Sequence, residues 1–233
     1  MANHKIKSKK DTGITVIIPS AGEGRRMKSY GPKSLIDLTI GNVLQRQIRL
    51  INKVLDNVNF IIVAGFDCDR LMDSCPDYFT KIENENYATT NVSRSIAMAL
   101  RAVETERVLI IYGDLVFNEK ALSIMDYSKS CTSASNDESR QHEVGCIVDS
   151  NGDIANMMYD LETKWNQIIY LDGAELGLFK KICQERKNRK LFGFEILNQV
   201  IDSGGKIKCV INNSIEVIDI DTSKDLIRAN NIK

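Results

Sequence analysis

The stretch that decides how this chain folds reads Val16-Ile17-Ile18-Pro19-Ser20-Ala21-Gly22-Glu23-Gly24-Arg25-Arg26-Met27, with Gly31-Pro32-Lys33 close behind. An apolar run passes directly into a loop of small residues, which is typical of a buried strand that ends in a turn. Backbone N–H groups in such a loop can approach phosphate oxygens closely, because glycine has no Cβ. Arg26 and Lys33 add the mobile positive charge that a polyanion attracts. The stretch therefore predicts a strand and loop that hold the phosphates of a nucleotide.

Two commoner glycine-rich loops differ from this one. A P-loop requires G-x-x-x-x-G-K-[ST], and the sequence contains no such string. The dinucleotide-binding fingerprint G-x-G-x-x-G requires a third small residue at the position that Met27 occupies here. An ordinary turn with solvated charges is the structural alternative, and the agreement of strand, loop and cations argues against it.

Composition indicates a globular chain without a general affinity for nucleic acid. The chain has 233 residues, of which 43% are apolar and 27% charged, so it can bury a full core as one α/β domain. Its formal net charge is zero, whereas an extended nucleic-acid surface needs a basic surplus. No apolar run approaches the ~20 residues of a membrane span. We therefore expect neither nucleic acid nor a membrane as a partner.

The N-terminal segment and the cysteines indicate a cytoplasmic protein. Residues 1–11 are polar and basic and have no apolar segment of the kind found in secretory signals. We expect a disordered tail there and one domain over residues 12–233. The six cysteines are dispersed and none has C-x-x-C spacing, so reduced thiols are expected rather than disulfides or a zinc site.

Apolar runs alternate with helical patterns along the chain. Strands are predicted over residues 14–19, 58–64, 78–82, 108–112, 144–148, 154–159, 167–171, 206–211 and 215–220. Helices are predicted over residues 43–55, 92–103, 173–183, 191–201 and 223–229. This order predicts a largely parallel sheet covered on both faces, with ligands bound at the carboxyl ends of its strands. The polar stretch 128–143 is predicted to be a mobile excursion.

Carboxylates at two strand ends are candidates for a Mg²⁺ site. Asp114 follows the strand predicted over residues 108–112, and Gly113 permits an unusual turn before it. Mg²⁺ takes one or two protein carboxylates and completes its shell with phosphate oxygens and water. Asp221 is the favoured second ligand, and Asp219 shares its strand face by alternation. A helix N-cap is the structural alternative for Asp221.

These residues resemble the nucleotidyltransferases that join a nucleoside triphosphate to a phosphorylated acceptor and release pyrophosphate. Residues 21–27 with Pro32-Lys33 are similar to the signature loop of that family. Gly113-Asp114 is similar to its first metal aspartate, and residues 221–226 resemble its closing D-T-x-E-D-L motif, with Lys224 where a Glu is usual. The resemblance implies a single Rossmann-like three-layer α/β domain with a mainly parallel mixed sheet, of the nucleotide-diphospho-sugar transferase type.

A further motif points to one branch of the family. Residues 84–96 are similar to the N-x-x-Y-x-x-x-N-x-x-x-S-[LI] motif of CTP:phosphocholine cytidylyltransferases and their sugar-phosphate relatives. The resemblance places Tyr87, Asn91 and Ser95 beside the base and the α-phosphate, with a core position for Tyr87 and a helix cap at Asn91 as the structural alternatives. The nucleotide-binding residues it implies are Ser20, Ala21, Gly22, Glu23, Gly24, Arg25, Tyr87, Asn91, Ser95 and Gly113.

The expected reaction needs no general base. A phosphate monoester is already largely a dianion at neutral pH and can attack the α-phosphorus directly, and both histidines lie in the tail or the polar stretch. The reaction does need charge compensation between two anions and a leaving pyrophosphate. We expect Mg²⁺ on Asp114 and Asp221 to provide part of it, with Arg26 and Lys33 as the catalytic cations.

Residues 159–175 are expected to contact the acceptor, by analogy with the fold. Trp165 is a candidate for stacking on a cationic or sugar group, with a buried structural role as the alternative. Asp172 is a candidate for attracting a cationic acceptor.

Several functions follow from these features. The resemblance favours transfer of CMP from CTP to phosphocholine or a similar compound, as in the synthesis of surface-polysaccharide or lipid precursors. Uridylyl, thymidylyl or guanylyl transfer to a sugar 1-phosphate is the alternative. A catalytically inactive nucleotide-binding regulatory protein is the hypothesis from another class, supported by Lys224. A homodimer is left open.

Overall fold

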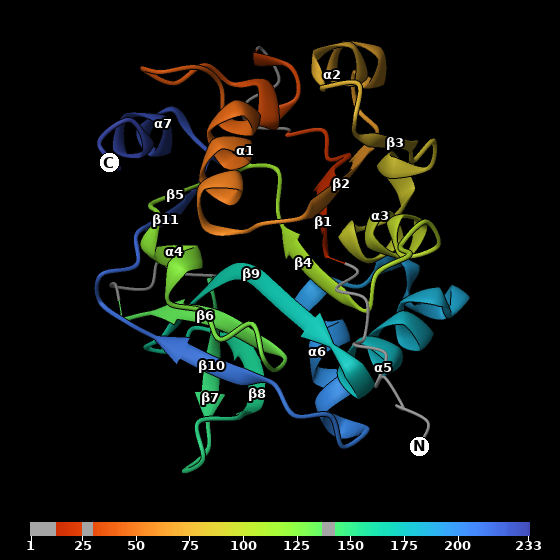
Figure 1. Cartoon of the computed structure of the whole chain (residues 1–233), viewed down its shortest axis with the longest axis vertical. Helices are drawn as coiled ribbons and strands as arrows, with labels where there is room; N and C mark the ends of the chain where they lie inside the picture. The colour runs from red at the N-terminus through yellow and green to blue at the C-terminus, as the bar shows by residue number, and fades with distance from the viewer. Residues whose placement is uncertain (1–12, 25–29, 137–142) are drawn as a thin grey trace, which may run out of the picture.

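The computed structural model describes residues 13–24, 30–136 and 143–233. They form one central sheet and the elements packed around it (Figure 1). The sheet has seven strands in the order β10-β6-β9-β4-β1-β2-β3. They are β1 (Ile14–Ser20), β2 (Val58–Ala64), β3 (Thr80–Glu83), β4 (Arg107–Ile111), β6 (Cys131–Ser135), β9 (Lys164–Asp172) and β10 (Lys208–Ile211). Only β9 runs antiparallel to its neighbours. The predicted mainly parallel α/β fold is confirmed.

Helices cover both faces of this sheet and produce three layers (Figure 1). Successive residues of a strand point to opposite faces, so Val16 packs with one core cluster and Ile17 with the other. The Val16 cluster includes side chains of α1 (Val43–Val54), α2 (Cys68–Ser74) and α4 (Lys120–Ser123). The Ile17 cluster includes side chains of α3 (Val92–Ala99), α5 (Gly173–Gln184) and α6 (Gly193–Asp202).

Smaller elements complete the molecule outside the central sheet. Two antiparallel pairs form, β5 (Leu115–Phe117) with β11 (Val217–Asp219) and β7 (Val144–Val148) with β8 (Ile154–Tyr159). The remaining elements are α7 (Ser223–Ala229) and the 3₁₀ helices η2 (Lys33–Leu35), η3 (Tyr87–Thr89) and η4 (Arg186–Lys190).

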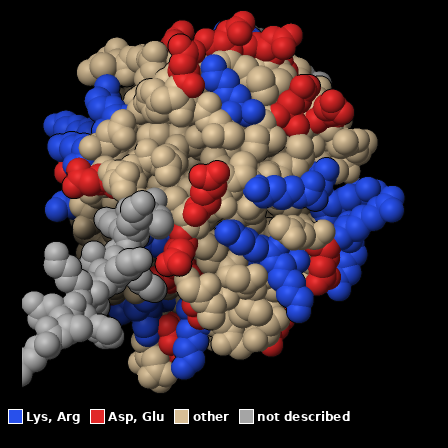
Figure 2. Space-filling view, turned by 45° about the vertical axis from the view of Figure 1, so that its right-hand side comes forward, with Lys and Arg blue, Asp and Glu red and all other residues tan. Residues whose placement is uncertain are grey.

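The surface carries charges of both signs. Acidic side chains gather at the top of the face shown in Figure 2 and basic ones toward its right, in a chain of zero formal net charge. Among the described residues, no helix is long and apolar enough to cross a membrane.

The predicted mobile excursion over residues 128–143 is wrong for its first half. Residues Cys131–Ser135 form β6, an inner strand whose five residues are all buried. Their small polar side chains satisfy their hydrogen bonds inside the protein: Thr132 Oγ1 donates to the carbonyl of Ile168 at 2.6 Å and accepts from Trp165 Nε1 at 2.8 Å. Polarity therefore did not mean exposure here. Residues 137–142 lie outside the described part of the chain, as does the predicted tail.

Other differences are local. The helix predicted over residues 92–103 ends at Ala99, and the strand predicted over 167–171 begins earlier, at Lys164. The short elements α2, β5 and α4 were not predicted, because four to seven residues, or three for β5, give too few periods of a pattern to recognise.

We predict that Thr132→Val destabilises the fold by about 1–3 kcal/mol, because it leaves the buried Trp165 N–H without an acceptor. The free energy of unfolding in urea measures the effect. Thr132→Ser keeps the hydroxyl and is the control; an equal loss in both variants would assign the effect to packing of the methyl group instead.

Candidate active site

A cavity of about 340 Å³ opens at the carboxyl ends of β1 and β4. Segments that are far apart in sequence meet in it, among them the loop after β1, the start of α3, the residues that follow β4 and those that follow β11. Most of the predicted nucleotide and metal residues line it, namely Ser20, Ala21, Gly22, Gly24, Lys33, Tyr87, Asn91, Ser95, Gly113, Asp114 and Asp221. Glu23 is described but does not line the cavity. Arg25 and Arg26 lie outside the described residues.

A close approach between β1 and β4 shapes the floor of this cavity. The N–H of Gly113 donates to the carbonyl of Pro19 at 3.1 Å. A Cβ on Gly113 would lie 1.9 Å from Ser20 Oγ and 3.2 Å from the Pro19 oxygen, so only glycine fits without a shift. The two strand ends can therefore present their loops to one ligand.

Two hydroxyls in the cavity wall are candidates for contacting that ligand. Ser20 Oγ and Ser34 Oγ are buried and have no hydrogen-bond partner among the described residues. A buried hydroxyl without a partner is costly unless a ligand or water satisfies it. Ser34 was not predicted, although it directly follows Lys33.

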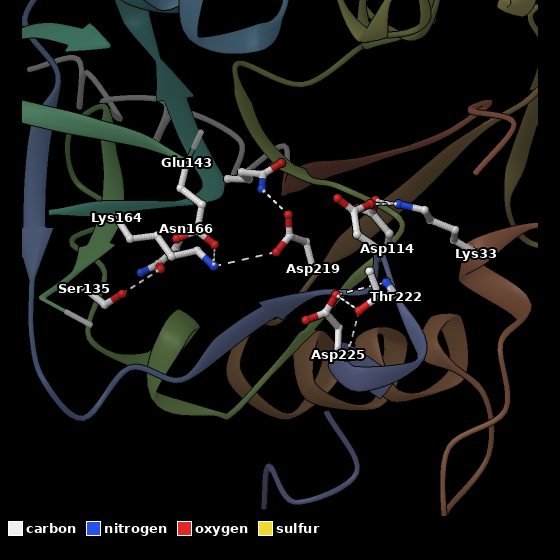
Figure 3. Close-up of polar contacts among 11 residues, drawn as sticks. Lys33, Asp114, Ser135, Glu143, Lys164, Asn166, Asp219, Thr222 and Asp225 are labelled. Atoms are coloured by element: carbon white, nitrogen blue, oxygen red, sulfur yellow. Dashed lines mark hydrogen bonds and ion pairs between the residues drawn. The ribbon is translucent and has the colours of Figure 1, made fainter. Parts of the chain in front are cut away.

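Lys33 brings two of the predicted metal ligands together. Its Nζ donates to Asp114 Oδ2 at 2.9 Å, a contact drawn in Figure 3, and to Asp221 Oδ1 at 2.5 Å. Burial by itself would lower the pKa of the Lys33 ammonium, but Asp114 and Asp221 outweigh that effect and raise it above its ordinary value. Burial raises the pKa of the Asp114 carboxyl, and the ammonium beside it opposes the rise. The Lys33 side chain is therefore protonated and positively charged at neutral pH.

Gly24 determines the path of the Lys33 side chain. Its φ is +55°, a conformation that favours glycine. A Cβ there would lie 3.1 Å from Lys33 Cγ and 3.4 Å from Lys33 Cε. The signature loop thus packs its backbone against the stem of the lysine.

Asp219 and Asp221 have different ion-pair partners, although both line the first cavity. Asp221 shares the Lys33 ammonium with Asp114. Asp219 Oδ1 lies 3.6 Å from the ammonium of Lys164 (Figure 3). The helix-cap alternative for Asp221 is wrong, because Thr222 is the N-cap of α7 and forms a capping box with Asp225. Lys224, which departs from the family motif, is exposed on that helix and does not line the cavity.

A second cavity of about 230 Å³ adjoins the first, and Tyr112, Gln167, Phe192 and Asp219 line both. Lys164 lies in its wall and pairs with Glu143 at 2.8 Å as well as with Asp219. Gln167 has φ +58° and its Nε2 lies 3.5 Å from Asp219 Oδ2. Lys164 and Gln167 lie within the stretch 159–175 that was expected to contact the acceptor, but neither was singled out, since the irregular stretch of β9 that presents Gln167 leaves no mark in the hydrophobic pattern.

Asn91, Ser95 and Tyr87 line the first cavity and also have structural contacts. The Asn91 side chain accepts from the N–H of Val92 at 2.8 Å and so caps α3, as the structural alternative predicted. Ser95 is 3% exposed and accepts from Asn84 Nδ2 at 3.1 Å. Tyr87 lies in η3 and is half-buried. Capping and lining the cavity are compatible at one residue.

The two predicted acceptor residues lie in different places. Trp165 lines the second cavity but is only 4% exposed, and its ring packs edge-on against Tyr112. Asp172 lies at the opposite edge of the sheet, because β9 is antiparallel to β4 and pairs Asp172 with Arg107 at the start of that strand. Its side chain accepts from Ser130 Oγ at 3.0 Å, so the structure does not bring Asp172 to either cavity.

Comparisons with known proteins agree with this architecture. The family model of the MobA-like NTP transferase domain matches residues 16–149. The bifunctional protein GlmU of Azotobacter vinelandii is 30% identical over 104 residues, and GlmU of Francisella tularensis subsp. novicida is 28% identical over the same length. Each match covers 44% of this chain and only 22% of the relative, so the chain spans about a fifth of the length of these proteins.

Solved structures of similar fold extend over nearly the whole chain. The CTP:phosphocholine cytidylyltransferase of Streptococcus pneumoniae superposes with a TM-score of 0.77 at 16% identity, covering 94% of this chain and 98% of that one. The inositol-1-phosphate CTP transferase of T. maritima gives 0.74 at 15%, covering 95% and 98%. A putative glucose-1-phosphate thymidylyltransferase of Bacillus anthracis gives 0.78 at 14%, covering 93% and 94%. These likenesses establish the nucleotide-diphospho-sugar transferase type of fold.

We predict that Gly113→Ala destabilises the protein by about 1–3 kcal/mol, because the new methyl group must displace Ser20 and the end of β1. Thermal unfolding measures the loss. Gly22→Ala is the matched control for stability, since a Cβ there meets no atom within 4 Å. Equal stability of the two variants would show that β1 and β4 tolerate a wider separation.

Proposed function

Because the chain belongs to the family of the MobA-like NTP transferase domain, we propose that it transfers CMP from CTP to a phosphorylated small molecule such as phosphocholine, releasing pyrophosphate. The observation that carries the proposal is the position of Lys33, Asp114 and Asp221 in the wall of the first cavity, which adjoins a second one. A cation and two carboxylates in a cavity with such a neighbour suit a reaction between two phosphates.

The first cavity is the proposed nucleotide site. The Ser20 and Ser34 hydroxyls would donate to phosphate oxygens, which are the acceptors that these buried groups need. Lys33 adds a positive charge beside them, and we propose the same role for Arg26 from the sequence alone. CTP is favoured by the resemblance of residues 84–96 to cytidylyltransferases, and two of the superposed structures are enzymes whose names include CTP.

Mg²⁺ is the proposed cofactor. The donor set suits it: Asp114 and Asp221 both reach one ammonium, so their oxygens already converge on a single cationic position. Among the described residues no group of three potential metal ligands is found, and Mg²⁺ needs only one or two protein carboxylates when phosphates and water complete its shell. When bound, the ion would offset charge on the triphosphate during transfer.

The second cavity is the proposed acceptor site. An oxygen of the acceptor phosphate forms a bond to the α-phosphorus while the bond from that phosphorus to the bridging oxygen of pyrophosphate breaks. Lys164 lies where its ammonium would hold the attacking phosphate, and Gln167 lies at the boundary between the two cavities.

The walls of the acceptor site favour a positively charged group on the substrate. Tyr159 and Phe192 expose 42% and 48% of their surfaces, and the carboxylates of Glu143 and Asp219 lie in the same cavity. Aromatic faces and carboxylates together attract a cation such as the trimethylammonium of choline. A sugar 1-phosphate is the second candidate, because its hydroxyls would pair with the same carboxylates.

All six cysteines are free thiols, which supports the proposed cytoplasmic location.

We predict that pyrophosphate release requires an NTP, a phosphorylated acceptor and a divalent metal together. The assay combines each of CTP, UTP, dTTP and GTP with phosphocholine, a phospho-inositol and several sugar 1-phosphates, and EDTA should abolish turnover. Turnover with unphosphorylated choline, or turnover unchanged by EDTA, would contradict the mechanism.

Asp114→Asn is the matching variant in that assay and should lose nearly all turnover while keeping the melting temperature. Asp160→Asn is its control, because Asp160 lines neither cavity. Nucleotide binding without turnover, for every acceptor, would favour the regulatory protein instead.

We predict that Lys164→Met lowers kcat/KM for the acceptor about 10–100-fold, the scale of a lost hydrogen bond to a charged group, and changes KM for the NTP little. Lys208→Met is the control: Lys208 also pairs with an aspartate, Asp153 at 2.9 Å, but away from both cavities. A larger effect on the NTP than on the acceptor would move Lys164 to the nucleotide side.

A further inference from the structure

We propose that Lys33 is a built-in counter-cation that competes with the divalent metal for Asp114 and Asp221 and turns to the phosphates when the metal displaces it (Figure 3). The inference rests on the proposed function in taking these two aspartates as the metal ligands. It goes further by giving Lys33 two successive partners.

The competition follows from shared atoms. The ammonium contacts Asp114 Oδ2 and Asp221 Oδ1 at 2.9 and 2.5 Å. Mg²⁺ binds carboxylate oxygens at about 2.0–2.1 Å and uses the same lone pairs that accept the ammonium's hydrogen bonds. Two cations on the same pair of oxygens would also repel one another at close range. Occupancy by the metal and by Lys33 is therefore mutually exclusive at these atoms.

The ammonium has a structural reason to stay where it is. Asp114 follows β4 and Asp221 precedes α7, so the two carboxylates come from separate segments. Their side chains are 26% and 45% exposed, and that of Lys33 is 16% exposed. Two carboxylates brought together in a partly dry cavity repel unless a cation lies between them. Lys33 supplies that cation from within the chain.

The direction of the displaced side chain is set by its surroundings. The Lys33 stem packs on the backbone of Gly24, in the same loop whose Ala21 and Gly22 line the nucleotide cavity. An ammonium that leaves the carboxylates thus remains beside the loop proposed to hold phosphates. Metal binding and triphosphate binding should consequently favour each other.

The test measures metal binding without nucleotide or turnover. Mn²⁺ is titrated into the full chain and free Mn²⁺ is followed by electron paramagnetic resonance. Lys33→Met keeps the length of the side chain and removes its charge, so it should bind Mn²⁺ about 10–100-fold more tightly than the wild type, the equivalent of one charged hydrogen-bonded pair. Lys53→Met removes a lysine of α1 that pairs with Glu119, and this variant should bind Mn²⁺ like the wild type. Equal or weaker binding by Lys33→Met overturns the proposal, as does an absence of Mn²⁺ binding in both proteins.

A second measurement needs no variant. Amine-reactive labelling of the wild type, read by mass spectrometry, should be slow at Lys33 and accelerate when Mg²⁺ is added, while Lys53 stays constant. Unchanged labelling at Lys33 overturns the proposal even if Lys33→Met does not fold. If Mn²⁺ competition is observed but no pair of NTP and acceptor gives pyrophosphate, the proposed function fails and the competition stands.

Discussion

The position of β1 in the middle of a parallel sheet is the constraint on which the rest of this structure depends. Its residues from Ile14 to Pro19 are buried, and it pairs in parallel with β2 on one side and β4 on the other. Parallel strands bring their carboxyl ends to one edge. The parallel arrangement of β1 and β4 therefore brings the glycine-rich loop and the Gly113-Asp114 turn together, and no further contact between them is needed. The missing Cβ of Gly113 then lets the two ends approach closely enough to line one cavity.

The same constraint explains how much the sequence could predict. Strands buried on both faces are continuous apolar runs, so residues 14–19, 58–64 and 108–112 indicated β1, β2 and β4 almost to the residue, and with them the site at their ends. β6 was missed because a five-residue strand of Cys, Thr, Ser and Ala has no apolar pattern; its burial depends on partners in β9 that are distant in sequence. Asp172 was misplaced for a related reason, since sequence order does not reveal that β9 runs antiparallel.

The second cavity depends on details that no local pattern encodes. One residue of β6 lies opposite three of β9, and Gln167 adopts a positive φ within that irregularity. Such strain is characteristic of functional positions. Asp219 and Asp221 flank the buried Ile220, yet Asp219 pairs with Lys164 and Asp221 with Lys33. Alternation could be read from the sequence, but which neighbour each carboxylate meets could not.

The two cavities draw on different stretches of the chain. The residues after β1 and β4 that line the first cavity all precede residue 115. The residues that line only the second cavity come from the stretch 143–194. Mutations in the later stretch can therefore reshape the second cavity without altering the glycine loop or its lysine. A few substitutions in that stretch could change which small molecule the second cavity binds. The residues of the first cavity, and the transfer chemistry proposed for them, would then stay the same. Such a division makes the fold a reusable scaffold for diversification.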